Sequence, residues 1–351
     1  MAEENQTTHK RRVRYSGKYP KKFEEKYKEL QPEKYKDTIE HVIKKGNTPA
    51  GMHISIMVNE ILDFLKIQPG ETGFDATLGY GGHTKAMLQC LKGQGHIYAT
   101  DVDPEESART RKRLEEAGFG EDILTIRLQN FCTIDEIAKE AGGFDFILAD
   151  LGVSSMQIDN PKRGFSFKVD GPLDLRLNQE AGISAAERLV AITKDELAGM
   201  LYENSDEPYC EELAKAITDE IRKGNRIDTT TKLRNIIEKT LDFLPEKEKK
   251  DTIKKTCQRT FQALRIDVNR EFEVLYEFME KLPDALKPGG RAAILTFHSG
   301  EDKLVKKALK EGYRAGIYAD YAKDVIRPSA QECAQNGRAR STKMRWAIKA
   351  E

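Results

Sequence analysis

The chain has 351 residues, of which 38% are hydrophobic and 33% are charged, and its mean hydropathy is −0.63. No stretch approaches the roughly 20 apolar residues that a membrane helix needs, and the polar N-terminal stretch has no apolar signal segment. These features exclude an integral membrane protein and predict a cytoplasmic one. Because 58 basic residues balance 58 acidic ones, any nucleic-acid binding has to depend on local charge rather than on the sum.

The cysteines and histidines show no metal-binding pattern. The five cysteines are Cys90, Cys132, Cys210, Cys257 and Cys333, and none forms a CxxC pair. The six histidines form no HExxH motif. The sequence therefore predicts free thiols in a reducing compartment and no metal.

Residues 1–50 form a basic N-terminal extension. Residues 9–36 contain eleven Lys or Arg against four Glu, a local charge of +7. We expect a mostly extended arm with short helical pieces over 21–30 and 33–45. Such a run fits contact with RNA phosphates, and it equally fits a solvated tail.

The next hundred residues predict an α/β core. Apolar residues at helical spacing predict a helix over about 56–65. Four apolar strands are then expected, over residues 73–79, 96–103, 123–129 and 144–152, with helices over about 83–91 and 104–118. This alternation is typical of a doubly wound parallel sheet, in which ligands bind at the carboxyl ends of the strands.

The alternation stops after the fourth strand. A loop over 160–183 is followed by helices only, over about 184–256, including segments at 193–202, 206–224 and 229–244 that each begin at a Thr or Asp capping position. One long helix is expected over about 257–282, then a fifth strand within 286–303 and final strands at 325–329 and 342–350. We therefore predict a core of residues 51–158 and 257–351, with residues 159–256 as an all-helical insertion that recognises RNA.

The segment DATLGYGGHT contains a nucleotide-binding glycine loop. Gly79, Gly81 and Gly82 suit a strand-to-helix turn on which a ligand presses, and Asp101 lies at the end of the second strand, where an acid binds ribose. NAD and S-adenosylmethionine fit these residues equally well. Two details favour S-adenosylmethionine: Thr84 replaces the third glycine of a dinucleotide motif, and Asp75 would repel a pyrophosphate but suit a cationic amino acid.

The end of the fourth strand predicts the substrate. Asp150 follows a buried run, where a carboxylate needs a partner, and a substrate amine would provide one. We expect Asp150 to orient that amine, or to contact the cofactor, with help from Ser154. Phe165 and Phe167 fit stacking on a flipped base, and they fit equally well as core residues that anchor the loop.

Further candidates lie in the last third of the chain. His298 follows the fifth strand at the same sheet edge, as an RNA-pocket residue or a structural one. Gln262, Arg265 and Asn269 share one helix face, for which we favour RNA or pocket contact over a solvated face. Arg338 and Arg340 belong to a basic cluster suited to phosphates.

Eight motifs together resemble one enzyme family. In chain order they are GYGGHT, DLGVSSMQID, RGFSF, DGPLDLR, RTFQALRIDVN, LKPGGR, FHSGEDK and RARSTKMR. From about residue 53 to the C-terminus, the chain is similar to the bacterial 16S rRNA (cytosine-N4)-methyltransferases, the MraW-like family. Three departures are the long N-terminal extension, Gly300 where Leu is common and Gly337 where Pro is common; they fit a paralogue with a shifted target.

The resemblance implies a class I, Rossmann-like methyltransferase core with an inserted helical domain. It implies S-adenosylmethionine as cofactor and, as substrate, a cytosine of 16S rRNA in the decoding region of the small subunit, near the P site. The cofactor positions of the family correspond to Gly81, Gly82, His83, Asp101, Phe131, Asp150 and Gln157. Two alternatives stay open, an NAD-dependent oxidoreductase and a non-catalytic RNA-binding or ribosome-assembly protein, and the sequence leaves a homodimer open as well.

Overall fold

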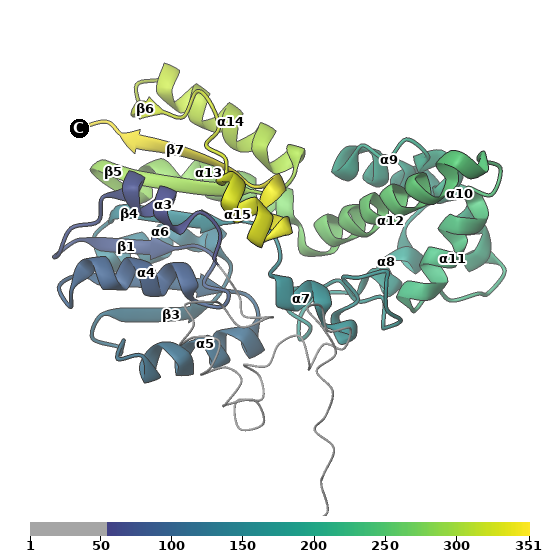
Figure 1. Ribbon diagram of the computed structural model, residues 1–351, viewed down its shortest axis with the longest axis horizontal. Helices are drawn as coiled ribbons and strands as arrows, with labels where there is room; N and C mark the ends of the chain where they lie inside the picture. The colour runs from purple at the N-terminus through teal and green to yellow at the C-terminus, as the bar shows by residue number, and fades with distance from the viewer. Residues whose placement is uncertain (1–54) are drawn as a thin grey trace, which may run out of the picture. The chain divides into compact units, whose positions relative to one another are not determined.

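The computed structural model describes residues 55–351. The chain divides into two units, Met1–His53 and Ile54–Glu351. The expected basic extension at residues 1–50 lies outside the described residues. The described residues belong to the second unit and are drawn in colour in Figure 1.

One seven-stranded sheet, in the order β3-β2-β1-β4-β5-β7-β6, organises this unit (Figure 1). The strands are β1 (Thr72–Asp75), β2 (His96–Asp101), β3 (Leu124–Leu128), β4 (Phe144–Asp150), β5 (Leu286–Thr296), β6 (Tyr318–Tyr321) and β7 (Lys343–Lys349). Strands β1 to β5 are parallel, as expected, and β7 is antiparallel to both of its neighbours. The strand order reverses between β1 and β4, which pair with each other, and such a reversal is where open α/β sheets bind ligands.

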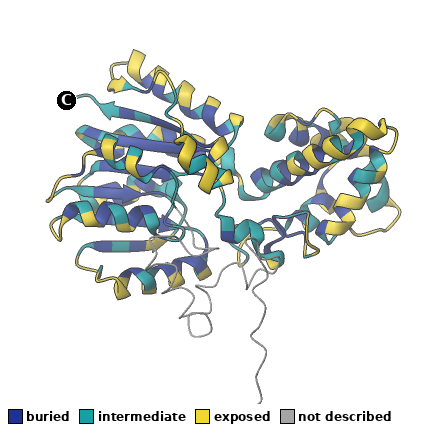
Figure 2. Cartoon of the chain, viewed as in Figure 1, coloured by how far each residue is buried: buried dark blue, intermediate teal, exposed yellow. Residues whose placement is uncertain are grey.

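Helices cover both faces of the sheet. The core helices are α3 (Val58–Leu65), α4 (Gly82–Leu91), α5 (Pro104–Glu116), α6 (Ile134–Ala141), α13 (Glu271–Ala285) and α14 (Ser299–Arg314). In β4, Ile147 packs with α6, α13 and α14, whereas Phe146 and Leu148 pack with α3, α4 and α5. Alternate side chains of a buried strand thus enter opposite layers, and Figure 2 shows the strands as the most buried part of the sheet region.

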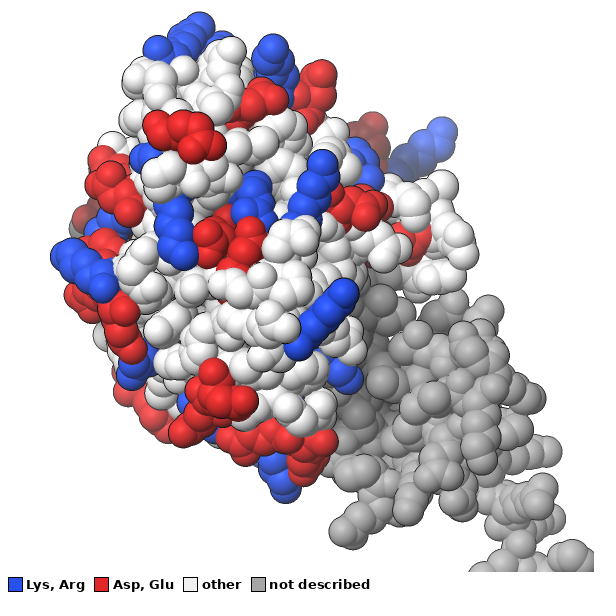
Figure 3. Space-filling view, turned by 90° about the vertical axis from the view of Figure 1, so that its left-hand side faces the viewer, with Lys and Arg blue, Asp and Glu red and all other residues white. Residues whose placement is uncertain are grey.

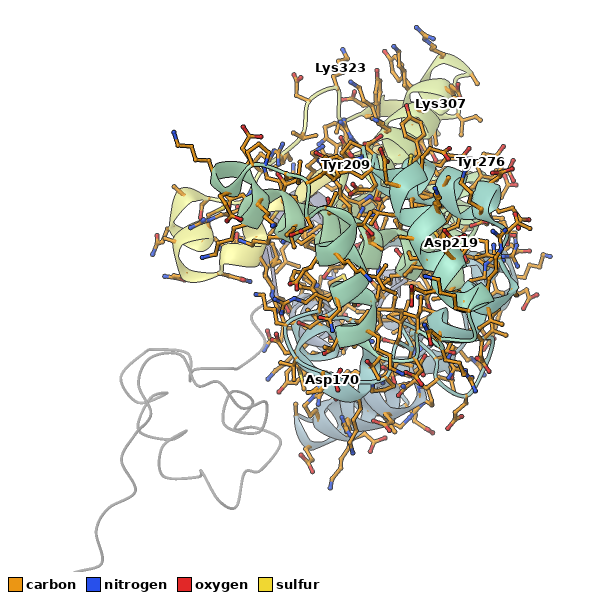
Figure 4. All side chains as sticks on the ribbon, turned by 90° about the vertical axis from the view of Figure 1, so that its right-hand side faces the viewer. Asp170, Tyr209, Asp219, Tyr276, Lys307 and Lys323 are labelled. Atoms are coloured by element: carbon orange, nitrogen blue, oxygen red, sulfur yellow. The ribbon has the colours of Figure 1, made fainter. Side chains whose placement is uncertain are left out.

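The helical segment has a core of its own. It comprises α8 (Ala185–Ala191), α9 (Lys194–Ser205), α10 (Cys210–Arg222), α11 (Thr230–Thr240) and α12 (Glu246–Asn269). Leu197, Leu213, Leu233 and Leu264 pack in one buried cluster. Figure 4 looks onto this segment, where Asp170, Tyr209 and Asp219 are labelled. The expected limit at residue 256 falls inside α12, so one continuous helix serves both parts, and the division into domains stays a prediction.

Two helix predictions are wrong. Asp206 does not begin a helix but ends α9 in the left-handed conformation, with φ 52°, and α10 starts at Cys210 instead. The single helix over 257–282 is two helices, because Arg270 adopts φ 51° between α12 and α13.

The C-terminal strands differ in part from the prediction. The segment 342–350 forms β7 as expected, but 325–329 contributes only an isolated bridge between Ile326 and Met344. The strand beside β7 is β6, which the sequence pattern did not indicate. No helix in the described range is long and apolar enough to cross a membrane.

Candidate active site

The glycine loop connects β1 to α4 and packs tightly against α5. Gly81, the N-cap of α4, has φ 82°, and a Cβ there would lie 2.6 Å from Thr110 Cγ2. Gly79 has φ 47°, and its carbonyl accepts a 2.6 Å hydrogen bond from Thr110 Oγ1. A Cβ on Gly82 would overlap Ser55 Oγ. All three glycines are therefore required by backbone shape or by space.

Asp101 fixes this loop from the end of β2. Its Oδ2 accepts from the Gly79 N–H at 2.8 Å, and its Oδ1 accepts from the Asp103 N–H at 2.8 Å. Burial raises the pKa of Asp101 to about 6, against the opposing effect of these two N–H groups. The predicted ribose acid is thus held in one orientation beside the loop.

Asp75 lies beneath the loop rather than in front of it. It is 1% exposed, and its carboxylate accepts from Thr84 Oγ1 at 2.6 Å and from the Thr77 N–H at 3.1 Å. Burial raises its pKa. The expectation that Asp75 presents a carboxylate to a cationic ligand is therefore corrected: the side chain holds the start of α4, and its charge acts only at a distance.

Asp150 ends β4 next to the loop. Its Oδ2 lies 3.4 Å from His83 Nδ1, and the other nitrogen of His83 is 2.9 Å from the Ile56 carbonyl. Asp150 Oδ1 is buried without a hydrogen-bond partner among the described residues. Burial raises the pKa of Asp150 to about 6, opposed by His83 and reinforced by Asp75 and Glu301. A buried acceptor without a partner marks a position where a ligand group can bind.

Ser154 and Gln157 form the capping box of α7 (Ser155–Asp159). Ser154 Oγ accepts from the Gln157 N–H, and Gln157 Oε1 accepts from the Ser154 N–H. Gln157 Nε2 also donates to Asp103 Oδ2 at 3.1 Å. The structure thus links Gln157 to Asp103, which adjoins Asp101, and it gives Ser154 a capping role.

Arg163 joins the same network, although it is not among the predicted site residues. Its guanidinium donates to Asp103 Oδ2 and to the Leu177 carbonyl, and both Arg163 and Asp103 are almost fully buried. Asp103 also caps α5 through the N–H groups of Glu105 and Glu106. The available signals were the second acid of DVD after β2 and the arginine of RGFSF.

The three predicted aromatic contacts have different surroundings. Phe131, in the short 3-10 helix Phe131–Thr133 that follows β3, is partly buried with its ring edge-to-face on Phe278 at 5.2 Å. Phe165 is 8% exposed within the helical core. Phe167 packs on Phe261 at 5.7 Å. Of the two expected alternatives for Phe165, its burial favours the loop-anchoring one, and Phe167 is partly covered in the same way.

His298 belongs to a buried charged cluster at the end of β5. Its Nε2 lies 3.3 Å from Glu301 Oε1, and Arg265 makes a bidentate ion pair with Glu271 at 2.8 and 2.9 Å. Ligand-capable atoms of Glu271, His298 and Glu301 lie within 4.8 Å of one another. Arg265 is thus paired with Glu271 rather than directed to solvent, and it already supplies a positive charge beside Glu271; its contact with RNA stays a prediction.

The two predicted phosphate contacts differ in accessibility. Arg338 is 36% exposed and donates to both carboxylate oxygens of Asp159 at 3.0 Å, which ties the short 3-10 helix Gly337–Ser341 to the end of α7. Arg340 is exposed. On the face of the α/β core drawn in Figure 3, basic and acidic side chains are interspersed, and that face shows no continuous basic patch of described residues.

The sheet order and the loop geometry together define a class of enzyme. A glycine loop after β1, an acid at the end of β2 and a buried acid at the end of β4 surround one point of the sheet edge. With the antiparallel strand β7 inserted between β5 and β6, this is the arrangement of a class I methyltransferase.

Sequence comparison gives the family. The MraW methylase family model matches residues 50–350, and the chain belongs to that family. The chain is 87% identical over 351 residues to "Ribosomal RNA small subunit methyltransferase H 1" of Agathobacter rectalis, covering 100% of both chains. The protein of the same name from Lachnoclostridium phytofermentans is 70% identical, covering 99% of this chain and 95% of its own. "Ribosomal RNA small subunit methyltransferase H" of Koribacter versatilis is 36% identical, covering 85% and 94%. Membership sets aside the oxidoreductase alternative.

Proposed function

We propose that this protein is a cytoplasmic enzyme that transfers a methyl group from S-adenosylmethionine to the exocyclic N4 amine of a cytosine. The target would lie in 16S rRNA, in the decoding region near the P site. The names of the relatives support rRNA of the small subunit as the substrate. The observation that supports an amine as the methyl acceptor is Asp150 Oδ1, which is buried beside the glycine loop without a hydrogen-bond partner among the described residues.

The residues around the loop fit the proposed cofactor. The Gly79, Gly81 and Gly82 turn is compact, because a Cβ would strain the backbone at Gly79 and would collide at Gly81 and Gly82, and the cofactor would bind beside this turn. Asp101, Phe131 and Gln157 would hold the nucleoside part, since they lie at the end of β2 and in the short helices that follow β3 and β4. The cofactor would supply an electrophilic methyl group on a positively charged sulfur, and the buried carboxyls Asp75 and Asp150 favour such a charge.

Asp150 would orient the amine. Oδ1 would accept one N–H of the amine, so that the nitrogen lone pair points at the methyl group, and His83 would hold Oδ2 in place. Holding reacting groups in line contributes up to roughly 7–11 kcal/mol in favourable cases. Ser154 keeps its hydroxyl proton free to donate while its oxygen caps α7, so a supporting role is compatible with the capping box.

RNA binding would involve the helical residues 159–256 together with Arg338, Arg340 and His298. Arg340 is exposed to reach a phosphate, and Arg338 places α7 near it through Asp159. A non-catalytic assembly protein would keep these contacts without needing Asp150.

Mass spectrometry of small-subunit rRNA from a deletion strain tests the proposal. One cytosine should lose its N4-methyl group, and expression of the intact gene should restore it. Asp150→Asn should not restore it, whereas the exposed-site control Asp63→Asn should. An unchanged modification map would refute the proposal, and restoration by Asp150→Asn would favour the assembly protein.

A further inference from the structure

His298 has an unusual environment for a structural histidine. Its Nδ1 is buried without a hydrogen-bond partner in the described part of the chain, its Nε2 lies 3.3 Å from Glu301 Oε1, and the side chain is 12% exposed. Its ring edge packs on Phe272, with ring centroids 5.7 Å apart. Gly300 makes room for this packing, because a Cβ there would lie 2.6 Å from Phe272 Cζ and 3.2 Å from His298 Nδ1. The protein thus positions the ring firmly through Nε2 and Phe272 and leaves Nδ1 available.

The ring lies at the same sheet edge as Asp150. Asp150 pairs in register with Leu295, three residues before His298, and the Leu151 N–H donates to the Leu295 carbonyl. Glu301, which adjoins His298, is close enough to Asp150 to raise the pKa of that carboxyl. A substrate amine held by Asp150 would therefore be near the His298 ring.

The charged groups around His298 favour a proton on its ring. Glu271 on α13 is balanced by Arg265 on α12 through the bidentate pair. Glu301 on α14 is 4% exposed, and its Oε2 accepts from the Phe297 N–H at 2.9 Å. Burial raises the pKa of Glu301, but His298, the Phe297 N–H and Arg265 together lower it by more, to below its ordinary value. No cation other than the His298 ring faces Glu301 within ion-pair distance among the described residues.

We infer that His298 accepts the proton that the substrate amine releases during methyl transfer, with Glu301 stabilising the resulting imidazolium. This inference rests on the proposed amine substrate. As the nitrogen–carbon bond forms, the carbon–sulfur bond breaks and its electron pair remains on sulfur. The amine nitrogen then carries one proton too many, which passes to a ring nitrogen of His298 and from there to water. The positive charge lost at sulfur is thus replaced by one at His298, beside Glu301.

Single-turnover methylation of small ribosomal subunits from the deletion strain tests this role. His298→Gln should slow transfer about 100-fold, as expected for loss of general base catalysis, and added imidazole should restore part of the rate. The affinity for S-adenosylhomocysteine, measured by calorimetry, should stay within about twofold, since no binding free energy is removed. The control is His96→Gln, since His96 lies at the opposite end of β2 and contacts Thr125.

Two further measurements do not depend on that variant folding normally. Glu301→Gln should lower the single-turnover rate while the affinity for S-adenosylhomocysteine stays within about twofold, because the imidazolium loses its neighbouring carboxylate. The acid limb of the pH–rate profile of Glu301→Gln should also differ from that of the wild type. A purely structural ring would change neither the rate nor the profile.

Several results would overturn the inference. One is transfer by His298→Gln at the wild-type rate with an unchanged pH profile. Another is loss of S-adenosylhomocysteine binding together with the rate, without imidazole rescue, which would make His298 structural. A third is dependence of the rate on added Mn²⁺ or Zn²⁺ and its loss with a chelator, which would make Glu271, His298 and Glu301 a metal site. A wild-type protein inactive on small subunits would instead refute the proposed function itself.

Discussion

Three carboxyl groups, one buried and two partly buried, lie at the candidate site, and their removal from water has an energetic cost. Asp75, Asp101 and Asp150 all have raised pKa values, with Asp101 and Asp150 near 6. An acid whose pKa is higher in the folded state stabilises the fold fully below its ordinary pKa of 3.8. That contribution is lost as the pH rises through about 6. The protein without ligand should therefore lose stability between about pH 4 and pH 7.

Asp150→Asn should remove part of this loss. Because Asn resembles the protonated acid, the variant should exceed the wild type in free energy of unfolding by about 2–3 kcal/mol at pH 8 and by little at pH 4. Denaturant unfolding at both pH values measures this, with exposed Asp63→Asn as the control. A variant that is inactive but more stable would show that the carboxylate serves function at the expense of stability; equal pH dependence in both proteins would contradict the expectation.

Gly81→Ala should separate backbone strain from crowding. Gly81 and Gly93 have similar φ values of 82° and 76°, but a Cβ at Gly81 meets Thr110 whereas one at Gly93 meets nothing within 4 Å. Both alanines should cost about 1 kcal/mol of stability from the left-handed conformation. Only Gly81→Ala should also weaken S-adenosylhomocysteine binding, by roughly tenfold or more, since a shift costing about 1.4 kcal/mol suffices. Equal binding by the two variants would show that the loop tolerates the displacement.

Among single residues, the sequence predicts the site residues that follow strands, but it does not predict contacts between residues that are far apart in the chain. Gly79, Asp101 and Asp150 follow apolar runs and could be located. Asp103 and Arg163 could not, because their contact joins positions 60 residues apart. The cluster around His298 and Arg265 likewise depends on how two helices and a strand meet.

Among the helices and strands, the break between α12 and α13 shows that the helical spacing of apolar residues does not predict where a helix ends. Helical spacing of apolar residues continues across it and predicts a single helix, yet Arg270 adopts φ 51°. Neither Pro nor Gly marks the position. The turn is supported from outside, since Asn269 Nδ2 donates to the Leu175 carbonyl and its Oδ1 accepts from the Leu177 N–H. Tertiary contacts outweigh local preference here.

Arg270→Gly should therefore stabilise the protein by about 1 kcal/mol, because glycine adopts this conformation without strain. Arg270→Val should do the opposite, since a β-branched residue is least tolerant of positive φ. Thermal unfolding of the three proteins should give the order Gly, Arg, Val. Any other order would mean that the Arg270 side chain stabilises the turn by more than the strain costs.

The strands also differ in how well the sequence predicts them, according to whether they contain a detectable apolar pattern. The five parallel strands contain apolar residues next to turn or helix signals, so the sequence predicts them to within a few residues. Strand β6, YADY, is only four residues long and half exposed, so it has no hydrophobic run to detect. The segment 325–329 has apolar residues, but Pro328 cannot donate to a neighbouring strand.

At the scale of the whole molecule, the Arg163–Asp103 ion pair connects the loop before the helical segment with the acids that follow β2, Asp101 and Asp103. Arg163→Met should lower the free energy of unfolding by about 3 kcal/mol, because Asp103 would remain buried without its partner. Arg109→Met removes a pair with Glu105 whose members are 50% and 63% exposed, and should change little. Chemical denaturation compares the two; equal stabilities would mean that water replaces the missing guanidinium.

The basic N-terminal extension calls for a test on the full chain. If residues 9–36 bind phosphates, neutralising their lysines and arginines should weaken binding to small-subunit rRNA. It should also flatten the dependence of log K on log salt by about 0.7–0.9 for each phosphate that the protein no longer neutralises. Unchanged affinity and slope would identify a solvated tail.

The buried Arg163–Asp103 pair could also couple the binding of the two ligands to each other. Arg163 contacts Asp103 on one side and the Leu177 carbonyl on the other, and Asp103 contacts Asp101. If RNA on the helical segment shifts Arg163 enough to tighten cofactor binding, then by thermodynamic reciprocity the cofactor tightens RNA binding by the same factor. After transfer, departure of either product would then loosen the hold on the other, so that release of the two products is cooperative.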